Sequence, residues 1–253
     1  MAKLINMLVA KYYRTLENNL IECNLCPRNC KIPEGQRGFC NIRINSNGIL
    51  YTEGYGKTIS VSMDPIEKKP LYHFFPGSKI LSIGPNGCNL DCQWCQNWQI
   101  SRRTATTQFY SPNSIINLAE THNSIGIAYT YSEPIIWFEY IIDVSQQARA
   151  SGLKNVLVTN GYINEEPLNS LLPYIDAINL DIKSMNPDFY KNICKGNLEP
   201  VLRTASLAYR HGIHLEITNL VIPGYNSKDE EFQLLGRWIK EYLSVETVLH
   251  LSA

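Results

Sequence analysis

The stretch Gly87-Cys88-Asn89-Leu90-Asp91-Cys92-Gln93-Trp94-Cys95 places three cysteines at the spacing C-x3-C-x2-C, shortly after an apolar segment. Three thiolates in one loop can hold three irons of a cubane cluster, whereas a simple electron carrier uses four thiolates for each cluster. The next cysteine is Cys194, far along the chain. The stretch therefore predicts an iron–sulfur site with one iron open to a ligand. A zinc site with a distant fourth ligand and buried cysteines without a metal are the alternatives.

Around this stretch, the chain from Lys79 onward alternates short segments rich in Ile, Val and Leu with segments of helical periodicity. Buried apolar strands that alternate with helices are typical of a parallel sheet. Six such strands make either an open sheet or an unclosed barrel. The predicted strands are Lys79–Ile83, Gly126–Thr130, Asn155–Thr159, Ala177–Ile182, His214–Ile222 and Thr247–Leu251. The predicted helices are Ser114–His122, Glu133–Ala150, Glu165–Leu172, Leu198–His211 and Lys228–Tyr242.

We therefore predict an α/β fold with two parts: an N-terminal extension over residues 1–76, rich in Gly, Pro, Asn and Cys, and a partial barrel over residues 77–253. Leu4, Leu8 and Lys11 stand at helical spacing and predict a helix at the start of the extension. At the other end, the strand Thr247–Leu251 stops two residues before the chain does. Because a strand in a parallel sheet normally leads into a covering helix, we expect the C-terminus to be truncated.

Composition narrows the class of protein. The 253 residues carry 23 Lys and Arg against 23 Asp and Glu, so the net charge is zero. That argues against a nucleic-acid or membrane partner, which needs a large positive field. A content of 44% hydrophobic and 18% charged residues excludes a disordered chain. No apolar run is long enough to span a membrane, and the start lacks a small-residue cleavage site. We expect a cytoplasmic protein whose cysteines are thiols or metal ligands.

A second group of cysteines lies in the extension. Cys23, Cys26, Cys30 and Cys40 have the spacing C-x2-C-x3-C-x9-C. Four thiolates in a segment with little apolar mass indicate a closed metal site that holds the segment together. Zinc and a second iron–sulfur cluster both fit this ligand set, and free thiols are the alternative.

The motifs together resemble those of radical S-adenosylmethionine (SAM) enzymes. Within that superfamily the chain is similar to the pyruvate formate-lyase activating enzyme-like branch, and in it to the radical SAM member of the AmmeMemoRadiSam system. The likeness covers nearly the whole chain. It is carried by Cys23–Pro27, Asp64–Leu71, Cys88–Asn97, Thr130–Pro134, Thr159–Gly161, Asp181–Lys183 and Val221–Gly224.

The resemblance implies a partial (β/α)6 barrel of the radical SAM type and a [4Fe–4S] cluster on Cys88, Cys92 and Cys95. The open iron would chelate the amino and carboxylate groups of SAM. Reductive cleavage of SAM would give a 5′-deoxyadenosyl radical that abstracts hydrogen from an unidentified substrate, in activating enzymes a partner protein. Such chemistry also implies an electron donor such as flavodoxin or ferredoxin. The competing interpretation is a metal-stapled binding or electron-transfer module that does not cleave SAM.

The resemblance also assigns candidate contacts to SAM. Trp94, between two ligands, would lie near the adenine, and its alternative role is a core residue that covers the cluster. Glu133 would face the amino group, and as an acid in the first turn of a helix it could instead favour the helix dipole. Thr159 ends the third strand on the same rim, beside an Asn-Gly turn signal.

Asp181 and Lys183 flank Ile182, so alternation places both on one face of the fourth strand. A charged pair that faces a barrel interior is costly without partners, which favours a ligand-binding role over a solvated loop. The resemblance makes Lys183 a contact to the SAM carboxylate and Asp181 a polar or cation-binding position. His250 in the last strand matches a SAM-contacting histidine, although a lone histidine in a strand is more often structural.

Overall fold

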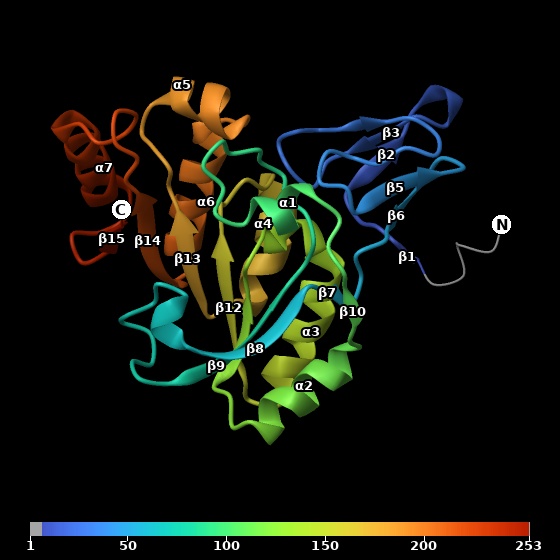
Figure 1. Ribbon diagram of the computed structural model, residues 1–253, viewed down its shortest axis with the longest axis horizontal. Coiled ribbons are helices and arrows are strands. Elements are labelled where there is room, and N and C mark those ends of the chain that lie inside the picture. The colour runs from blue at the N-terminus through green and yellow to red at the C-terminus, as the bar shows by residue number, and fades with distance from the viewer. Residues whose placement is uncertain (1–6, 253) are drawn as a thin grey trace.

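The fold is built on one sheet of seven strands, in the order β15-β14-β13-β12-β11-β9-β8, in a computed structural model that describes residues 7–252 (Figure 1). Six of these strands run parallel, and β8 pairs antiparallel with β9 at one edge. The strands are β8 (Ser60–Pro65), β9 (Lys79–Gly84), β11 (Gly126–Tyr129), β12 (Lys154–Thr159), β13 (Ala177–Asp181), β14 (His214–Leu220) and β15 (Val248–Ser252). The predicted α/β fold with six parallel strands is confirmed.

Helices alternate with the parallel strands and lie outside the sheet (Figure 1). All five predicted helices are present, and most of their ends lie within one or two residues of the predicted ends. The helix predicted over Glu133–Ala150 consists of the turn η3 followed by α3. The helices are α1 (Trp98–Arg102), α2 (Pro112–Thr121), α3 (Phe138–Ala150), α4 (Glu165–Leu171), α5 (Pro187–Phe189), α6 (Leu198–Arg210) and α7 (Asp229–Tyr242). Single turns of other helix types are η1 (Glu17–Asn19), η2 (Ile66–Lys68), η3 (Pro134–Trp137), η4 (Leu172–Tyr174) and the π-helical η5 (Tyr190–Cys194).

The two faces of the sheet bury different partners, as the alternation of side chains along a strand requires. Residues such as Leu81, Ile127 and Leu157 belong to the main core with the helices. The opposite face buries Ile80, Ala128, Val156 and Ala177 against Ile66, Leu71 and Phe74. The segment of residues 66–75, which links β8 to β9, therefore closes the lower end of the inner face. We call this segment, with the strand residues it touches, the barrel floor.

The strand β8 is a feature that the sequence analysis missed. Ser60 pairs with Gly84 and Pro65 with Lys79, so β8 extends the main sheet although it lies within the predicted extension. The boundary predicted at residue 76 therefore leaves one strand of the main sheet on the side of the extension, and the division into two parts stays a prediction. β8 alternates Ser with hydrophobic residues, and most of its residues are partly buried, as expected of a strand at the edge of the sheet.

The N-terminal lobe carries two small antiparallel sheets, β1-β6-β5 and β2-β3-β4, beside the barrel (Figure 1). Their strands are β1 (Leu8–Val9), β2 (Tyr13–Thr15), β3 (Ile21–Cys23), β4 (Lys31–Ile32), β5 (Arg43–Ser46) and β6 (Ile49–Thr52). The helix predicted from Leu4, Leu8 and Lys11 is wrong over the described residues. Leu8 pairs with Thr52, because backbone pairing to β6 prevails over the helical spacing; Leu4 lies outside the described residues.

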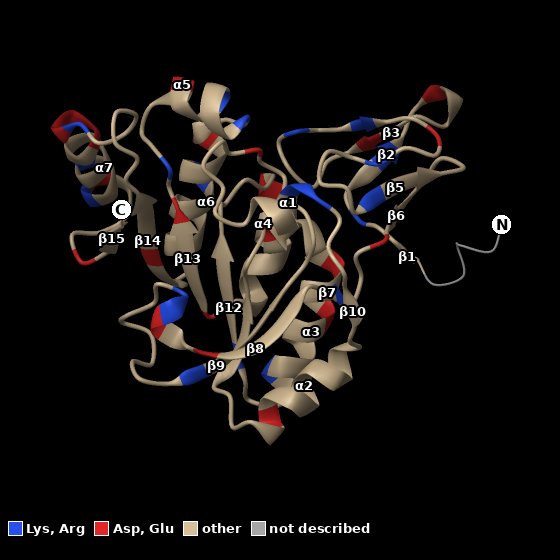
Figure 2. Ribbon diagram, in the orientation of Figure 1, with Lys and Arg blue, Asp and Glu red and all other residues tan. Residues whose placement is uncertain are grey.

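A short two-stranded sheet, β7 (Lys57–Thr58) with β10 (Gln108–Phe109), ties the N-terminal lobe to the chain that follows α1. The lobe is also anchored by a buried ion pair, in which Arg43 Nη2 lies 2.7 Å from Glu139 Oε1 on α3. Basic and acidic residues are interspersed in both parts of the molecule (Figure 2). Over residues 7–252, no helix is long and apolar enough to cross a membrane.

Candidate functional site

The three-cysteine loop leaves the carboxyl end of β9 and is held by backbone contacts on two sides. Gly87 N–H donates to the Ile100 carbonyl on α1 at 2.8 Å. Asp91 N–H donates to the Cys194 carbonyl at 2.9 Å, which fixes the loop to η5. Because loops converge at the carboxyl ends of barrel strands, the cysteines lie where a barrel builds its active site. We call this end of the sheet the barrel mouth.

The sulfur atoms of this loop face hydrogen-bond donors. Leu90 N–H lies 3.4 Å from Cys88 Sγ, and Asn160 Nδ2 lies 3.7 Å from the same sulfur. The Cys194 thiol donates to Cys92, and this bond lowers the pKa of Cys92 to about 7. Donors that point at sulfur stabilise thiolates and tune the clusters that thiolates hold. The same bond and burial raise the pKa of Cys194.

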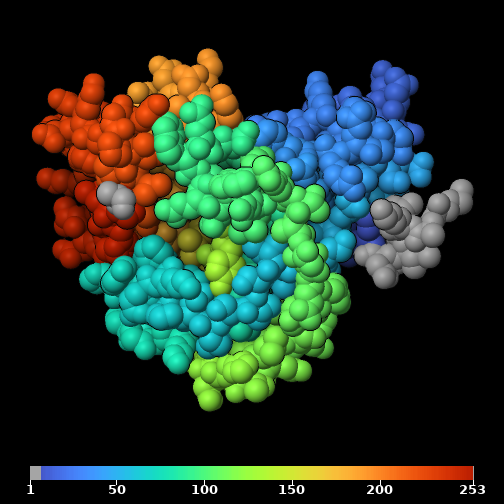
Figure 3. Space-filling model, in the orientation of Figure 1, coloured from blue at the N-terminus to red at the C-terminus, as the bar shows by residue number. Residues whose placement is uncertain are grey.

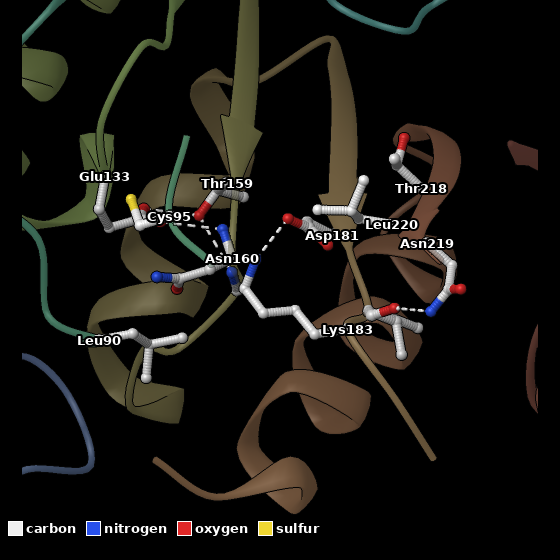
Figure 4. A network of polar contacts seen from close by, with 12 residues as sticks. Leu90, Cys95, Glu133, Thr159, Asn160, Asp181, Lys183, Thr218, Asn219 and Leu220 are labelled. Carbon is white, nitrogen blue, oxygen red and sulfur yellow. Dashed lines mark hydrogen bonds and ion pairs between the residues drawn. The ribbon is translucent and has the colours of Figure 1, made fainter. Parts of the chain in front are cut away.

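Glu133 links its own segment, at the start of η3, to the end of β12 (Figure 4). Its carboxylate accepts hydrogen bonds from Thr159 Oγ1 at 2.6 Å, from Asn160 N–H at 2.9 Å and from Ile135 N–H at 3.0 Å. Burial raises the pKa of Glu133 to about 7 although these donors oppose the shift. The side chain therefore caps η3 and positions Asn160 against the cysteine loop. Its predicted contact to SAM, and that of Thr159, stay predictions.

Asp181 and Lys183 lie side by side at the end of β13, as alternation predicts (Figure 4). Lys183 Nζ is 2.5 Å from Asp181 Oδ2. Burial disfavours the charge on Lys183, but Asp181 and Cys92 outweigh it, so the pKa of Lys183 is raised. The other carboxylate oxygen, Asp181 Oδ1, is buried and has no hydrogen-bond partner among residues 7–252. An acceptor in that state is costly unless a ligand supplies the donor.

Next to this pair is an apolar pocket that reaches the cysteine loop. It is lined by Cys92, Trp94, Lys183, Phe189, Ile193, Cys194, Leu220 and Ile222. Trp94 packs against Tyr225 with 4.2 Å between ring centroids, and more than a third of its surface is exposed. The structure thus brings Trp94, Lys183 and Cys92 together around one pocket.

His250 belongs to a different cluster. Its Nε2 lies 2.6 Å from Glu216 Oε2, and its ring packs at a tilt of 38° against Tyr72 with centroids 5.1 Å apart. Glu216 also accepts from Tyr72 N–H and His73 N–H and pairs with His214. Glu216 is fully buried, so this network fastens the barrel floor to β14. The predicted SAM contact of His250 stays a prediction, and the partner that the structure gives it is Glu216.

Three residues of the mouth escaped the sequence analysis: Asn160, Cys194 and Tyr225. Asn160 stood in the turn signal Thr159-Asn160-Gly161, and its position just past a strand end was the available clue. Cys194 and Tyr225 reach the site from segments far from the cysteine loop, which no local pattern discloses.

The residues present fit a [4Fe–4S] cluster with SAM. The loop offers three thiols, and two donors face the sulfur of Cys88. Asp181 Oδ1 lacks a donor within the described part of the chain, and the Lys183 ammonium stands beside it. These groups match the ammonium, carboxylate and hydroxyl groups of a nucleoside–amino acid ligand. Figure 3 shows the surface hollowed between the barrel floor, the segment around α1 and the C-terminal elements, so the inner face is reachable from solvent.

Comparisons with known proteins identify the family of the chain. The family model described as the radical SAM superfamily matches residues 82–235. An uncharacterized protein, MJ0808 of Methanocaldococcus jannaschii, is 46% identical over 246 residues, which cover 96% of this chain and 73% of that protein. The pyruvate formate-lyase 1-activating enzyme of Escherichia coli is 23% identical over 180 residues, which cover 68% of this chain and 73% of the enzyme.

Among solved structures, a radical SAM methyltransferase from Sphaerobacter thermophilus superposes with a TM-score of 0.53 at 13% identity. The match covers 70% of this chain and 56% of that structure, and it bears on the fold alone. The family match extends over the cysteine loop, Glu133, Asp181 and Lys183. The chain therefore belongs to the radical SAM superfamily and is an enzyme of SAM-cleaving radical chemistry, which that superfamily performs with a [4Fe–4S] cluster and SAM.

Proposed function

We propose that Cys88, Cys92 and Cys95 hold a [4Fe–4S] cluster whose fourth iron binds SAM, and that the chain generates a radical which activates a protein substrate. When bound, the cluster and SAM supply a 5′-deoxyadenosyl radical that takes a hydrogen atom from the substrate. The observation that carries the proposal is the buried Asp181 Oδ1 without a donor in residues 7–252, in the same mouth as the three cysteines.

The chain's own residues bind and orient the ligand. The Lys183 ammonium attracts the carboxylate of SAM, since charge-assisted contacts are among the strongest hydrogen bonds. Asp181 Oδ1 accepts from an ammonium or hydroxyl group of the ligand. Three groups hold the Lys183 backbone in place: Tyr190 Oη accepts from Lys183 N–H at 3.0 Å, Asn226 Nδ2 donates to the Lys183 carbonyl at 2.7 Å, and Asn219 Nδ2 donates to the Ile182 carbonyl at 2.7 Å. This rigid backing favours a preorganised site.

The apolar pocket beside Cys92 receives the adenine. Trp94 and Ile222 line it, and apolar walls exclude water from a reactive radical. The Cys194 thiol supports Cys92 by donating to its sulfur. Glu133 acts as a positioning residue, because it holds Asn160 against Cys88.

The substrate class is proposed from the relatives. Pyruvate formate-lyase activating enzymes act on a protein, and this chain shares 23% identity with one of them over most of its length. To test this class, the reconstituted enzyme is incubated with SAM, dithionite and the macromolecular fraction of an extract from cells grown on deuterated amino acids. Deuterium in the 5′-deoxyadenosine formed with that fraction would support a protein donor, and product free of deuterium would contradict it.

Cleavage of SAM is tested on the anaerobically reconstituted protein with dithionite. We expect 5′-deoxyadenosine from the wild type and none from Cys92→Ala, which loses a cluster ligand. Cys194→Ala is the matched control, because it removes a buried thiol of the same site that donates to Cys92 and binds no iron. It should keep its cluster. An intact reduced cluster that forms no product, or loss of the cluster from Cys194→Ala, would contradict the proposal.

A further inference from the structure

The four cysteines of the N-terminal lobe line a single cavity. Cys23 is the last residue of β3, Cys26 and Cys30 stand in the hairpin loop before β4, and Cys40 precedes β5. The cavity is lined by Cys23, Leu25, Cys26, Arg28, Cys30, Ile32, Gly38, Phe39, Cys40, Arg43, Asn89 and Ile136. Four thiols from separate turns thus converge although they are spread over the sequence.

Two arginines, Arg28 and Arg43, stand in the lining of this cavity beside the four thiols. The Arg43 side chain is only 1% exposed, and its Nε has no hydrogen-bond partner in the described chain. A buried guanidinium N–H without an acceptor, on the wall of a four-thiol cavity, calls for an anionic acceptor inside it.

The geometry favours a cluster over a single ion. Zinc draws four sulfurs to about 2.3 Å from one centre. Within residues 7–252, no three His, Cys, Asp or Glu side chains come together closely enough to hold one metal ion. Cys88, Cys92 and Cys95, to which the proposed function assigns a cubane, are likewise not drawn together around one point among the described residues. Four thiolates complete the ligand set of a closed [4Fe–4S] cluster.

The two cysteine sites share a wall. A Cβ on Gly87, the residue before Cys88, would lie 2.4 Å from the Cys40 carbonyl oxygen, so only glycine allows this approach. Arg28 crosses from the N-terminal cavity to the mouth, where its Nε donates to the Asn89 carbonyl within the cysteine loop. Asn89 itself lines the N-terminal cavity, and its Oδ1 accepts from Asn160 at 3.0 Å. The sites are thus joined through direct backbone and side-chain contacts.

We propose that Cys23, Cys26, Cys30 and Cys40 hold a second, fully ligated [4Fe–4S] cluster through which the electron for the SAM site enters. The external low-potential donor is oxidised by one electron as the N-terminal centre is reduced. That centre is reoxidised as the centre at Cys88, Cys92 and Cys95 is reduced, and neither transfer moves a proton or breaks a bond. The relay rests on the proposed function, whereas the second cluster itself does not.

The wild-type full chain, purified and reconstituted without oxygen, tests the cluster by metal analysis. Two [4Fe–4S] clusters require about eight irons per chain and no zinc. In pulsed electron paramagnetic resonance of the reduced protein, the two centres should show magnetic interaction with each other. About four irons with one zinc, or two reduced centres without interaction, would overturn the proposal. These measurements need no variant and are independent of turnover.

The double variant Cys26→Ala/Cys30→Ala then tests the relay. It should lose half of the iron and keep a reduced centre whose spectrum SAM perturbs, whereas the control Cys194→Ala should keep all the iron. With reduced flavodoxin as donor, the rate at which the remaining centre is reduced should fall by about tenfold or more in stopped-flow measurements. The reason is that loss of the N-terminal centre raises the barrier to electron transfer. Equal rates would overturn the relay. If SAM perturbs neither centre in the wild type, the proposed function fails while the metal count still decides the second cluster.

Discussion

The two ends of the inner face of the sheet satisfy their charges in opposite ways. At the floor, Glu216 has four protein partners and Asp64 pairs with Lys69 at 2.7 Å while Tyr131 donates to the same oxygen. At the mouth, Asp181 has one oxygen paired and the other buried without a donor over the described residues. Since unpaired buried acceptors are costly, the difference separates a structural end from a ligand-binding end.

The same contrast explains the position of the candidate histidine. His250 and Asp181 are close in strand register, because both pair with Thr218 on β14. The His250 ring nevertheless pairs with Glu216 and stacks on Tyr72, which belong to the floor. Changes at the floor should therefore alter stability, whereas changes at the mouth should alter the binding of SAM.

Glu216→Ala should have the largest effect. It leaves His214, His250 and two backbone N–H groups without their shared acceptor inside a buried network. Removing one partner of such a network costs about 3–5 kcal/mol in the free energy of unfolding. Urea denaturation monitored by circular dichroism measures it. A decrease in the free energy of unfolding below about 1 kcal/mol, which is typical of exposed ion pairs, would contradict the structural role of the floor.

Acid should weaken the floor through the same carboxylate. Burial alone would raise the pKa of Glu216, but His214, His250 and the two N–H groups prevail and lower it to about 2. Because the folded state holds the carboxylate ionised, its contribution is complete above about pH 5 and disappears as the pH falls toward 2, by up to about 3 kcal/mol. The difference in unfolding free energy between wild type and Glu216→Gln isolates it. A difference that stays constant across this range would refute the linkage.

Asp181→Asn sharpens the other side of the comparison. The amide keeps the size of the side chain but weakens a charged acceptor, so the dissociation constant of SAM should rise by about ten- to a hundredfold, or ~1.5–3 kcal/mol. Isothermal titration calorimetry on the reconstituted protein gives this value. The melting temperature should stay near that of the wild type. Unchanged affinity with lower stability would place Asp181 among the structural residues.

The smallest effect is expected for His250→Gln. Glutamine can still donate to Glu216, so the change should cost about 1 kcal/mol of stability and leave the affinity for SAM unchanged. Isothermal titration calorimetry of His250→Gln with SAM measures this affinity, as for Asp181→Asn. A marked loss of affinity in this variant would restore the SAM contact that the sequence resemblance implies for His250.

The main sheet and helices were predictable because the period of the apolar residues is local information. The strands β9 and β12 and the helix α6 lie within one residue of the predicted ranges at most ends. The pairing of Asp181 with Lys183 was also predictable, since alternation along one strand places them together. The cysteine loop was predictable from the spacing of its three cysteines alone. These features share one property, which is that the deciding residues are neighbours in sequence.

The rest depended on partners distant in the chain. Leu8 and Val9 form a strand because β6 is available to pair with them, and helical spacing could not reveal it. The strand β8 was hidden by its polar alternation. Glu216 stood unremarked within a predicted strand, because the N–H groups of Tyr72 and His73 that make it structural come from another segment. The convergence of Cys40 with Gly87 likewise appears only in three dimensions.

The central claim is that the cluster on Cys88, Cys92 and Cys95 leaves one iron for SAM. Electron paramagnetic resonance of the reduced, anaerobically purified protein tests it most directly, with spectra recorded before and after SAM is added. We predict that the signal of this centre shifts on addition and that Cys92→Ala lacks the signal altogether. A spectrum that SAM leaves unaltered, or zinc bound to these three cysteines, would contradict the claim.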